Sequence, residues 1–482
     1  MSATRGELSE ELLARATGGA WVRRPDRPVR GAAIDSRDLP PRADDAGPLF
    51  VALRGERTDG HRYLGAAWEA GAAAALIDDP RAESAAPDGL GLLRVDDARR
   101  ALGAAAAAWR GVLRDAGVRV VGVTGSNGKT TTVRYVHAAL SHAGLVGTRS
   151  TKSYNNDLGV PLTLLNAPVG DSYVVCEIGT SGPGEIAALT AIAEPDVGLI
   201  TSIGRAHLER LGSIEGIARE KASLLRGVAA GGVRLASADA AVLRPHLPDG
   251  TALVGMAGDA DARVMEDDGG WALRPAAGPA VPLSPPLAGW FQACNAALAV
   301  EVAARVFGVE RPTAAEGVAR AETPEMRMAR SVVALGDGEA VVVNDAYNAN
   351  PESVRAAVDL LVAGAFDGPG TRRRVLVLGD LLELGDASGE IHGEMVRRVA
   401  AAGDAIGAVW LVGPEFASAA GAAAGREPEA SDAACARIAA SIGPGDVVLI
   451  KGSRGVRLER VAEAIAARAT GGASRVAAGE RG

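Results

Sequence analysis

The chain has 482 residues, of which 48% are hydrophobic and 23% charged, and this composition excludes an intrinsically disordered protein. At roughly 150 residues per domain, the length predicts about three domains. The formal net charge of −8 arises from 51 basic and 59 acidic residues without a long basic run, which argues against a nucleic-acid partner.

The cysteines and the apolar runs indicate the compartment. Cys176, Cys294 and Cys435 are widely spaced and form no metal or redox motif, so we expect three buried thiols in a reducing environment. The N-terminus MSATRGELSEELL has acidic residues where a signal peptide needs an apolar core. Because no apolar run reaches the ~18 residues of a membrane span, the sequence predicts a cytoplasmic protein without one.

Residues 1–115 are predicted to form a small α/β domain with two polar clusters after its strands. Ser36 and Arg37 follow the predicted strand 29–34, and the cluster 55–61, which includes Asp59 and His61, follows the strand 49–53. Such clusters are typical of solvated turns. The alternative is that they hold a polar ligand at the strand ends.

The stretch 118–144, VRVVGVTGSNGKTTTVRYVHAALSHAG, predicts a phosphate-binding loop between a strand and a helix. In such a loop the backbone N–H groups and the helix N-terminus bind phosphate, Lys129 adds a charge, and the Thr130 hydroxyl can ligate magnesium. The glycines stand at 125 and 128, closer together than in the common G-x-x-x-x-G-K-[ST] loop. A glycine-rich turn without a ligand is the alternative, but the lysine and threonine fall where phosphate binding needs them.

Strands and helices alternate from 116 to 322, which favours a mainly parallel sheet in a second domain. Glu177 and His207 follow apolar runs, so we expect them at the sheet edge that carries the loop, where they could face magnesium. Imidazole is an unusual magnesium ligand, and a structural role for His207 is an equal alternative. Lys221 on a predicted helix is typical of a surface lysine, unless carbon dioxide converts it into a carbamate that can bind a metal.

Residues 323–468 repeat the alternation and predict a third domain. Its strands are followed by polar residues, among them Asp345 and Lys451-Gly452-Ser453-Arg454. Ligands gather at such strand ends in open α/β sheets, so we expect a second site here. Residues 469–482 are expected to form a disordered tail. The predicted fold class is α/β, with a central, mainly parallel P-loop sheet between a small N-terminal α/β domain and a Rossmann-like C-terminal domain.

Seven sequence blocks fall in the second and third predicted domains, and the LFVAL-GE-DGH pattern falls in the first. The blocks are TGSNGKTTT, NNDLGVPLTLL, PGEIAALTAIAEPDV, GRAHLERLGSIEGIAREK, NDAYNANPES, LGDLLELG and LIKGSRG. In this order they resemble the Mur ligases, the ATP-dependent amide-forming enzymes of peptidoglycan precursor synthesis. YNANP and GDLLELG resemble the member that adds D-alanyl-D-alanine to UDP-N-acetylmuramoyl-tripeptide.

The resemblance implies ATP as co-substrate, Mg²⁺, and a role for each matching residue. Lys129, His207 and Lys221 would be catalytic. The nucleotide would contact Gly125, Ser126, Asn127, Gly128, Lys129, Thr130, Thr131, Asn295, Arg327 and Asp345. Thr130 and Glu177 would ligate one magnesium ion, and His207 with carbamoylated Lys221 a second. The UDP-muramoyl-peptide would contact Ser36, Arg37, Asp59, His61, Asn155 and Asn156, and the dipeptide would lie near Lys451, Ser453 and Arg454.

The chain departs from the family pattern at three positions near these residues. Gly289-Trp290-Phe291 stands where the family tends to have Gly-x-His before Asn295. Ser202 stands where asparagine is typical, and Met326 replaces a glycine before Arg327. Two other functions stay open: a sister ligase that adds the third-position diamino acid, and a nucleotide-binding subunit without ligase activity that works through a partner. We expect a monomer.

Overall fold

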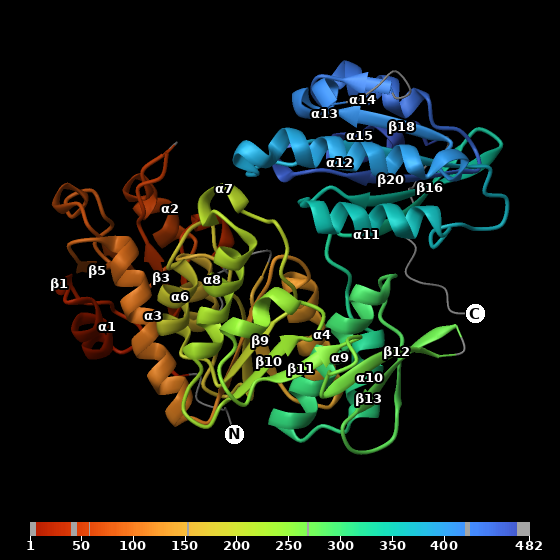
Figure 1. The fold of residues 1–482 in the computed structure, drawn as a ribbon. Helices are drawn as coiled ribbons and strands as arrows, with labels where there is room; N and C mark the ends of the chain where they lie inside the picture. The colour runs from red at the N-terminus through yellow and green to blue at the C-terminus, as the bar shows by residue number, and fades with distance from the viewer. Residues whose placement is uncertain are drawn as a thin grey trace.

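The structure is a computed structural model that describes residues 6–39, 46–56, 58–151, 154–267, 269–419 and 425–469. Three sheets follow one another along the chain (Figure 1). Apart from residue 469, the predicted disordered tail 469–482 lies outside the described residues. Within those residues, every helix is too short or too polar to cross a membrane.

The N-terminal unit is a five-stranded sheet in the order β1-β5-β4-β3-β2. Strands β2 to β5 run parallel, and β1 pairs with β5 in the antiparallel sense. Its strands are β1 Ala20–Arg23, β2 Val29–Ala33, β3 Gly47–Val51, β4 Ala74–Ile77 and β5 Gly91–Arg94; its helices are α1 Glu10–Thr17, α2 Leu64–Glu69 and α3 Ala98–Asp115, with 3₁₀ turns η1 Ser36–Asp38, η2 Gly60–Tyr63 and η3 Pro80–Ala82.

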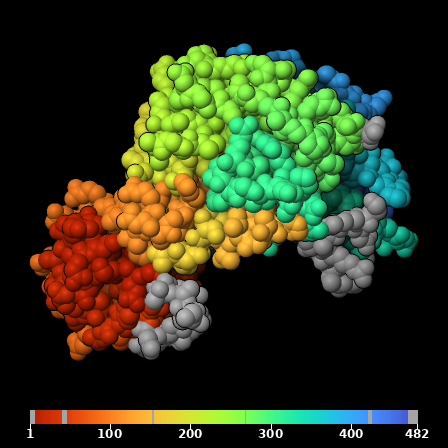
Figure 2. All heavy atoms as spheres, turned by 90° about the horizontal axis from the view of Figure 1, so that it is seen from below, coloured from red at the N-terminus to blue at the C-terminus, as the bar shows by residue number. Residues whose placement is uncertain are grey.

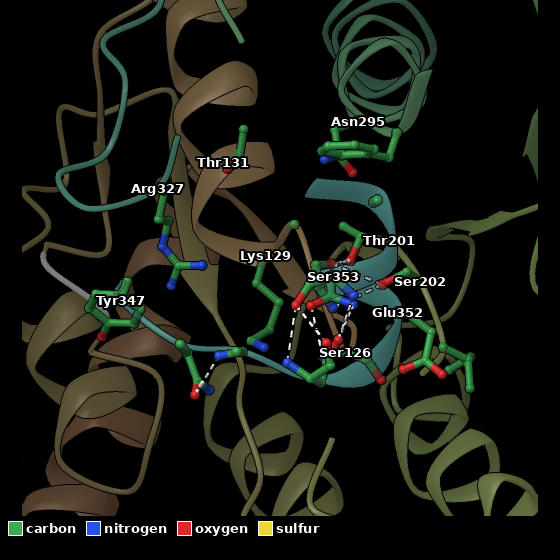
Figure 3. A pocket seen from close by; sticks show the side chains of 18 of the residues that line it. Ser126, Lys129, Thr131, Thr201, Ser202, Asn295, Arg327, Tyr347, Glu352 and Ser353 are labelled. Atoms are coloured by element: carbon green, nitrogen blue, oxygen red, sulfur yellow. Dashed lines mark hydrogen bonds between the residues drawn. The ribbon is translucent and has the colours of Figure 1, made fainter. Parts of the chain in front are cut away.

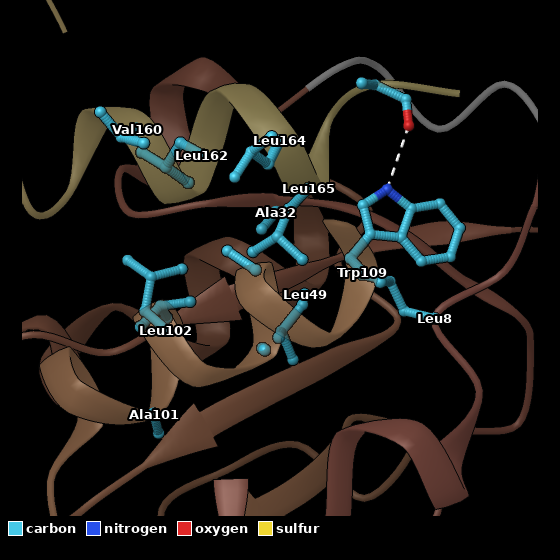
Figure 4. Close-up of a cluster of buried hydrophobic side chains, with 14 of the residues drawn as sticks. Leu8, Ala32, Leu49, Ala101, Leu102, Trp109, Val160, Leu162, Leu164 and Leu165 are labelled. Carbon is cyan, nitrogen blue, oxygen red and sulfur yellow. Dashed lines mark hydrogen bonds between the residues drawn. The ribbon is translucent and has the colours of Figure 1, made fainter. Parts of the chain in front are cut away.

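One continuous apolar core joins the N-terminal sheet to the next unit (Figure 4). Leu49 of β3 and Leu102 of α3 belong to the same buried cluster as Val160 and Leu164 of α5, a helix of the central unit. The indole N–H of Trp109 donates to the Ala167 carbonyl at 3.1 Å, so the polar atom of this buried ring is satisfied. This shared core holds the two units together.

The central unit is a nine-stranded sheet in the order β14-β13-β12-β11-β10-β9-β6-β8-β7. Strands β6 to β12 pair in parallel, and β13 and β14 add an antiparallel extension. The strands are β6 Arg119–Thr124, β7 Gly147–Arg149, β8 Tyr173–Glu177, β9 Val197–Ile200, β10 Val233–Ser237, β11 Ala252–Gly255, β12 Ala262–Asp267, β13 Gly270–Pro275 and β14 Val281–Leu283; the helices are α4 Lys129–His142, α5 Gly159–Leu165, α6 Glu185–Ala193, α7 Leu208–Leu211, α8 Ile214–Arg226, α9 Trp290–Phe307 and α10 Arg311–Ala319, with η4 Ala241–His246.

The C-terminal unit is a six-stranded sheet in the order β15-β16-β20-β17-β18-β19, parallel except for β15. The strands are β15 Ala329–Leu335, β16 Gly338–Asp345, β17 Arg373–Gly379, β18 Ala408–Val412, β19 Gly425–Glu427 and β20 Asp446–Lys451; the helices are α11 Pro351–Val362, α12 Ser388–Ala401, α13 Pro414–Ala419, α14 Asp432–Ala440 and α15 Glu459–Ala466, with η5 Gly385–Ala387, η6 Gly403–Ala405 and η7 Arg454–Val456.

The predicted fold class is confirmed, since the structure has three mostly parallel α/β units and the central one carries the glycine-rich loop. Seen from below, the N-terminal unit in red forms a lobe at one end of the molecule (Figure 2). The domain limits at 115/116 and 322/323 stay predictions.

Candidate active site

The loop between β6 and α4 has the backbone that its glycines allow. Gly125 has φ +152° and Gly128 has φ +83°, both values that favour glycine. A Cβ at Gly125 would stand 2.0 Å from the Thr201 hydroxyl oxygen, so no larger residue fits without movement. The residues after β9 support the loop, because Ser202 accepts from the Ser126 N–H through its carbonyl and from the Asn127 N–H through its hydroxyl, both at 2.9 Å.

Lys129 opens α4 and turns its side chain back over the loop. Its Nζ donates to the Gly125 carbonyl at 2.9 Å. Burial lowers the pKa of Lys129, and the Arg327 charge lowers it further against the attraction of Glu177. A phosphate bound at the loop would therefore supply negative charge beside this buried ammonium.

Glu177 lies beside Thr130, as parallel pairing of β6 and β8 predicts. The register sets Val123 opposite Glu177, and the Thr130 hydroxyl donates to the Glu177 carboxylate at 2.7 Å. The second carboxylate oxygen accepts from the Asn155 amide at 2.9 Å, and the side chain is buried. Mg²⁺ takes oxygen ligands and often combines one carboxylate with waters and phosphate oxygens, so Thr130 and Glu177 fit this ion.

His207 and Lys221 lie in the same charged region. His207 has φ +60° at the start of α7, and its Nδ1 pairs with the Glu383 carboxylate of the C-terminal unit. Burial lowers the pKa of the His207 ring. Lys221 is 1% exposed, which contradicts the surface-lysine alternative, and burial together with the Lys129 charge lowers its pKa to about 7. In the described part of the chain, no group of three His, Cys, Asp or Glu side chains is arranged for a metal.

Asn295 faces the loop from α9. A Cβ at Gly128 would approach the Asn295 amide to 2.8 Å, and that amide donates to Gln292 at 3.3 Å. Trp290, at the start of the same helix, is 46% exposed at the cavity wall. The residues that replace the Gly-x-His pattern thus supply aromatic surface beside the buried Asn295.

The C-terminal strand ends contribute a second charged group. Lys451 at the end of β20 pairs with Asp345 at the end of β16, with 2.6 Å between Nζ and Oδ2, and both are buried. Asp345 also accepts from the Met328 N–H at 3.1 Å. The Arg327 guanidinium lies 4.2 Å from the centre of the Tyr347 ring, while the Arg454 guanidinium lies 5.9 Å from it.

A cavity of about 610 Å³ brings the central and C-terminal groups together (Figure 3). The predicted site residues that line it are Ser126, Asn127, Gly128, Lys129, Thr131, Asn155, Asn156, Glu177, His207, Asn295, Arg327, Asp345, Lys451 and Arg454. Other predicted residues lie behind this lining: Gly125, Thr130, Lys221 and Ser453, whose hydroxyl accepts from the Leu382 N–H at 2.9 Å. The Asn156 side-chain oxygen accepts from the Gly159 N–H at the start of α5, at 3.0 Å.

The N-terminal candidates do not line this cavity. Arg37 pairs with Asp35 at 2.6 Å, next to Ser36 in the turn η1. Asp59 lies 2.6 Å from Nδ1 of His61, and Nε2 of the same ring accepts from the Asp78 N–H at 3.2 Å. Residue 57 of the second polar cluster lies outside the described residues.

Two further signals in the sequence point to the site, and one of them marks residues to which the motifs gave no role. Tyr347 and Asn348 line the cavity, and both belong to the YNANP motif. The chain also has four lysines among its 51 basic residues, and Lys129, Lys221 and Lys451 all lie at this site. Because almost all the other basic residues are arginines, a lysine in this chain indicates a position that requires a compact ammonium group.

Family models match this chain in each unit. They are "Mur ligase family, catalytic domain" over residues 28–110, "Mur ligase middle domain" over 123–303 and "Mur ligase, glutamate ligase domain" over 326–454. The UDP-N-acetylmuramoyl-tripeptide--D-alanyl-D-alanine ligase of Bacillus subtilis is 34% identical over 446 residues, which cover 90% of this chain and 92% of that protein. The chain belongs to the Mur ligase family.

Solved structures agree with this membership. MurF from Acinetobacter baumannii superposes on this Mur ligase with a TM-score of 0.80 and 27% identity, covering 96% of this chain and 100% of that one. MurF ligase from Thermotoga maritima, solved in complex with ADP, gives a TM-score of 0.73 and 26% identity over 95% of this chain and 99% of that one. The predicted family is therefore confirmed.

Proposed function

We propose that this Mur ligase joins D-alanyl-D-alanine to UDP-N-acetylmuramoyl-tripeptide with hydrolysis of ATP to ADP and phosphate. One observation carries the proposal: the phosphate loop and the C-terminal strand ends line a single cavity, in a chain similar over nine-tenths of its length to a ligase of that name. A nucleotide at the loop would meet substrates held by the C-terminal unit.

The reaction runs in two steps. The terminal carboxylate of the tripeptide attacks the γ-phosphorus of ATP and forms a new O–P bond. The bond between the γ-phosphorus and the bridging oxygen breaks, which gives an acyl phosphate and ADP. The amine of D-alanyl-D-alanine then attacks the acyl carbon and loses a proton, and inorganic phosphate departs. Both steps gather negative charge, which Lys129 and Arg327 would stabilise by preorganised electrostatics.

One Mg²⁺ would be held by Thr130 and Glu177, and a second by His207 with a carbamate on Lys221. When bound, these ions would supply positive charge against the phosphate oxygens. The carbamate forms when the neutral Lys221 amine attacks carbon dioxide and loses a proton, which replaces a cation by an anion. Burial of Lys221 beside Lys129 supports this step, because a second buried ammonium there is unfavourable.

The carbamate has a direct test. After exchange into ¹³C-bicarbonate, the wild-type protein should show a carbamate carbon signal in its NMR spectrum, and Lys221→Ala should lack it. Lys221→Ala should also lose activity while it still binds ADP. A fully active wild-type protein without the signal would contradict carbamoylation.

The remaining assignments are part of the proposal. Asn295 would contact the adenine, and Asp345 the ribose. Ser36, Arg37, Asp59 and His61 would hold the UDP end, Asn155 and Asn156 would lie towards the muramoyl-peptide, and Lys451, Ser453 and Arg454 would lie near the dipeptide. We also propose domains 1–115, 116–322 and 323–468, a monomer, and a cytoplasmic location.

ADP release with different acceptors tests the function. Supplied with UDP-N-acetylmuramoyl-tripeptide and Mg-ATP, the wild-type protein should release ADP when D-alanyl-D-alanine is added. Release with UDP-muramoyl-dipeptide and diaminopimelate or lysine instead would identify the sister ligase. No release with any acceptor would favour the nucleotide-binding subunit.

A further inference from the structure

The first turn of α11 reaches from the C-terminal unit to the phosphate loop. The Asn350 amide donates to the Asn127 side-chain oxygen at 2.8 Å, and the Asn127 amide donates back to the Asn350 oxygen at 3.2 Å. Asn127 belongs to the loop itself, and Asn350 is 6% exposed. This reciprocal pair joins residues 223 positions apart in the chain.

Glu352, two residues further along, holds the segment that supports the loop. Its carboxylate accepts from the backbone N–H of Arg205 at 2.8 Å and from Nε of Arg205 at 2.9 Å. A Cβ at Gly204 would stand 2.7 Å from the Glu352 carboxylate, so the glycine permits this close approach. Gly204 in turn accepts from the Ser126 hydroxyl at 2.9 Å and donates to it at 2.8 Å.

The helix itself orients Asn350. Its side-chain oxygen also accepts from the Ser353 N–H at 2.9 Å, while the Ser353 hydroxyl accepts from the Asn350 N–H at 3.0 Å, which forms a capping box. Asn350 and Glu352 therefore move with α11 as one rigid group. Any movement of the C-terminal unit away from the loop breaks both contacts together.

We propose that Asn350 and Glu352 form a clamp through which the C-terminal unit holds the phosphate loop in its nucleotide-binding conformation. Both are positioning residues: Asn350 acts through Asn127, and Glu352 acts through Arg205. Gly204, the neighbour of Arg205, is in turn hydrogen-bonded to Ser126. The clamp makes nucleotide affinity depend on the position of the C-terminal unit, because the contacts that bring this unit against the loop also hold the loop in shape. The inference rests on the proposed nucleotide site.

The test separates the clamp from a helix cap. Asn350→Ser keeps a good N-cap residue for α11, but its side chain is too short to reach Asn127. Removal of the amide pair should weaken ADP binding about tenfold, measured by calorimetry with Mg²⁺ present. Glu352→Gln keeps the shape of the side chain and removes its charge, and should weaken ADP binding about fivefold.

Ser431→Ala is the matched control. Ser431 caps α14 in the same unit by accepting from the Ala434 N–H at 3.3 Å, and it does not line the cavity. Its loss should lower the thermal stability without changing ADP affinity, whereas Asn350→Ser should change ADP affinity with little change in stability.

A double-mutant cycle with Asn127→Ala decides whether the two asparagines act through each other. If they do, Asn350→Ser should have almost no further effect on ADP affinity in the Asn127→Ala background. Additive losses in the cycle, or unchanged ADP affinity in both Asn350→Ser and Glu352→Gln, would overturn the clamp. Failure of the wild-type protein to bind ADP would instead overturn the proposed function.

Discussion

The phosphate loop and the C-terminal strand ends bring positive charge to one cavity in opposite ways. Lys129 belongs to a run of consecutive residues whose shape comes from two glycines. Its Nζ donates to a backbone carbonyl; burial lowers its pKa, the Glu177 carboxylate raises it and the Arg327 guanidinium lowers it. Lys451 is joined to Asp345 from another strand, and each is the buried counter-ion of the other. In our proposal the charge in the loop binds the nucleotide, whereas the charge at the strand ends also stabilises the fold.

Lys129→Met tests the role of the loop charge and should have the largest effect on activity. Loss of one preorganised electrostatic group costs at least about 100-fold in rate. Glu177 is the buried anion whose charge acts most strongly on Lys129, but it keeps its hydrogen bonds from Thr130 and Asn155 when Lys129 is replaced. Stability should therefore change by less than about 1 kcal/mol. ADP release and urea unfolding measure the two effects. Near-normal turnover would contradict the assignment of Lys129.

Gly125→Ala should show that backbone shape, as well as charge, makes the loop. The added methyl group would meet the Thr201 hydroxyl at 2.0 Å and displace the loop. A shift of about 1 Å in a reacting group costs about 100-fold in rate. Gly144→Ala is the control, since Gly144 also has positive φ but has open space around it. Equal rates for both variants would refute the steric argument.

Lys451→Met tests the other side of the comparison, the ion pair at the C-terminal strand ends. The substitution leaves Asp345 buried without its counter-ion, so we expect a loss of about 3–5 kcal/mol in the free energy of unfolding. Lys129→Met carries the same chemical change on the loop and serves as the control. Adding Asp345→Asn to Lys451→Met should recover part of the loss. If the two methionine variants are equally stable, the comparison fails.

Tyr347→Leu should have the smallest effect. It tests a residue of the C-terminal unit that contacts Arg327, one of the cations near the loop. The ring holds the Arg327 guanidinium by a cation–π contact worth about 0.5–1 kcal/mol at an exposed site. We therefore expect about a threefold rise in KM for ATP with kcat nearly unchanged. Tyr347→Phe keeps the ring and should behave as the wild type. A large fall in kcat for Tyr347→Leu would assign the tyrosine a different role.

The loop was predictable because its structure is local. Strand, glycines, lysine and helix are consecutive, and within the stretch 118–144 the structure forms the strand Arg119–Thr124 and the helix Lys129–His142. The burial of Lys221 had a signal as well: it lies four residues after Ile217 and four before Leu225, on the apolar face of α8. A lysine on such a face is a buried one.

Contacts between distant segments were not predictable. The amide pair of Asn127 and Asn350 and the pairing of His207 with Glu383 depend on how the C-terminal unit packs against the loop. The hydrophobic periodicity of the sequence describes one helix or strand at a time, so it carries no information on how the C-terminal unit packs against the loop. At the N-terminal strand ends the reason is different, because polar residue types do not say which groups they contact. In the structure Arg37 pairs with Asp35, and His61 contacts Asp59.

The origin of the oxygen in the released phosphate tests the central claim most directly. UDP-N-acetylmuramoyl-tripeptide labelled with ¹⁸O in its terminal carboxylate would be incubated with ATP, Mg²⁺ and D-alanyl-D-alanine, and the phosphate analysed by mass spectrometry. Attack of that carboxylate on the γ-phosphorus predicts one ¹⁸O atom in each released phosphate. Unlabelled phosphate, or label in AMP, would contradict amide formation through an acyl phosphate.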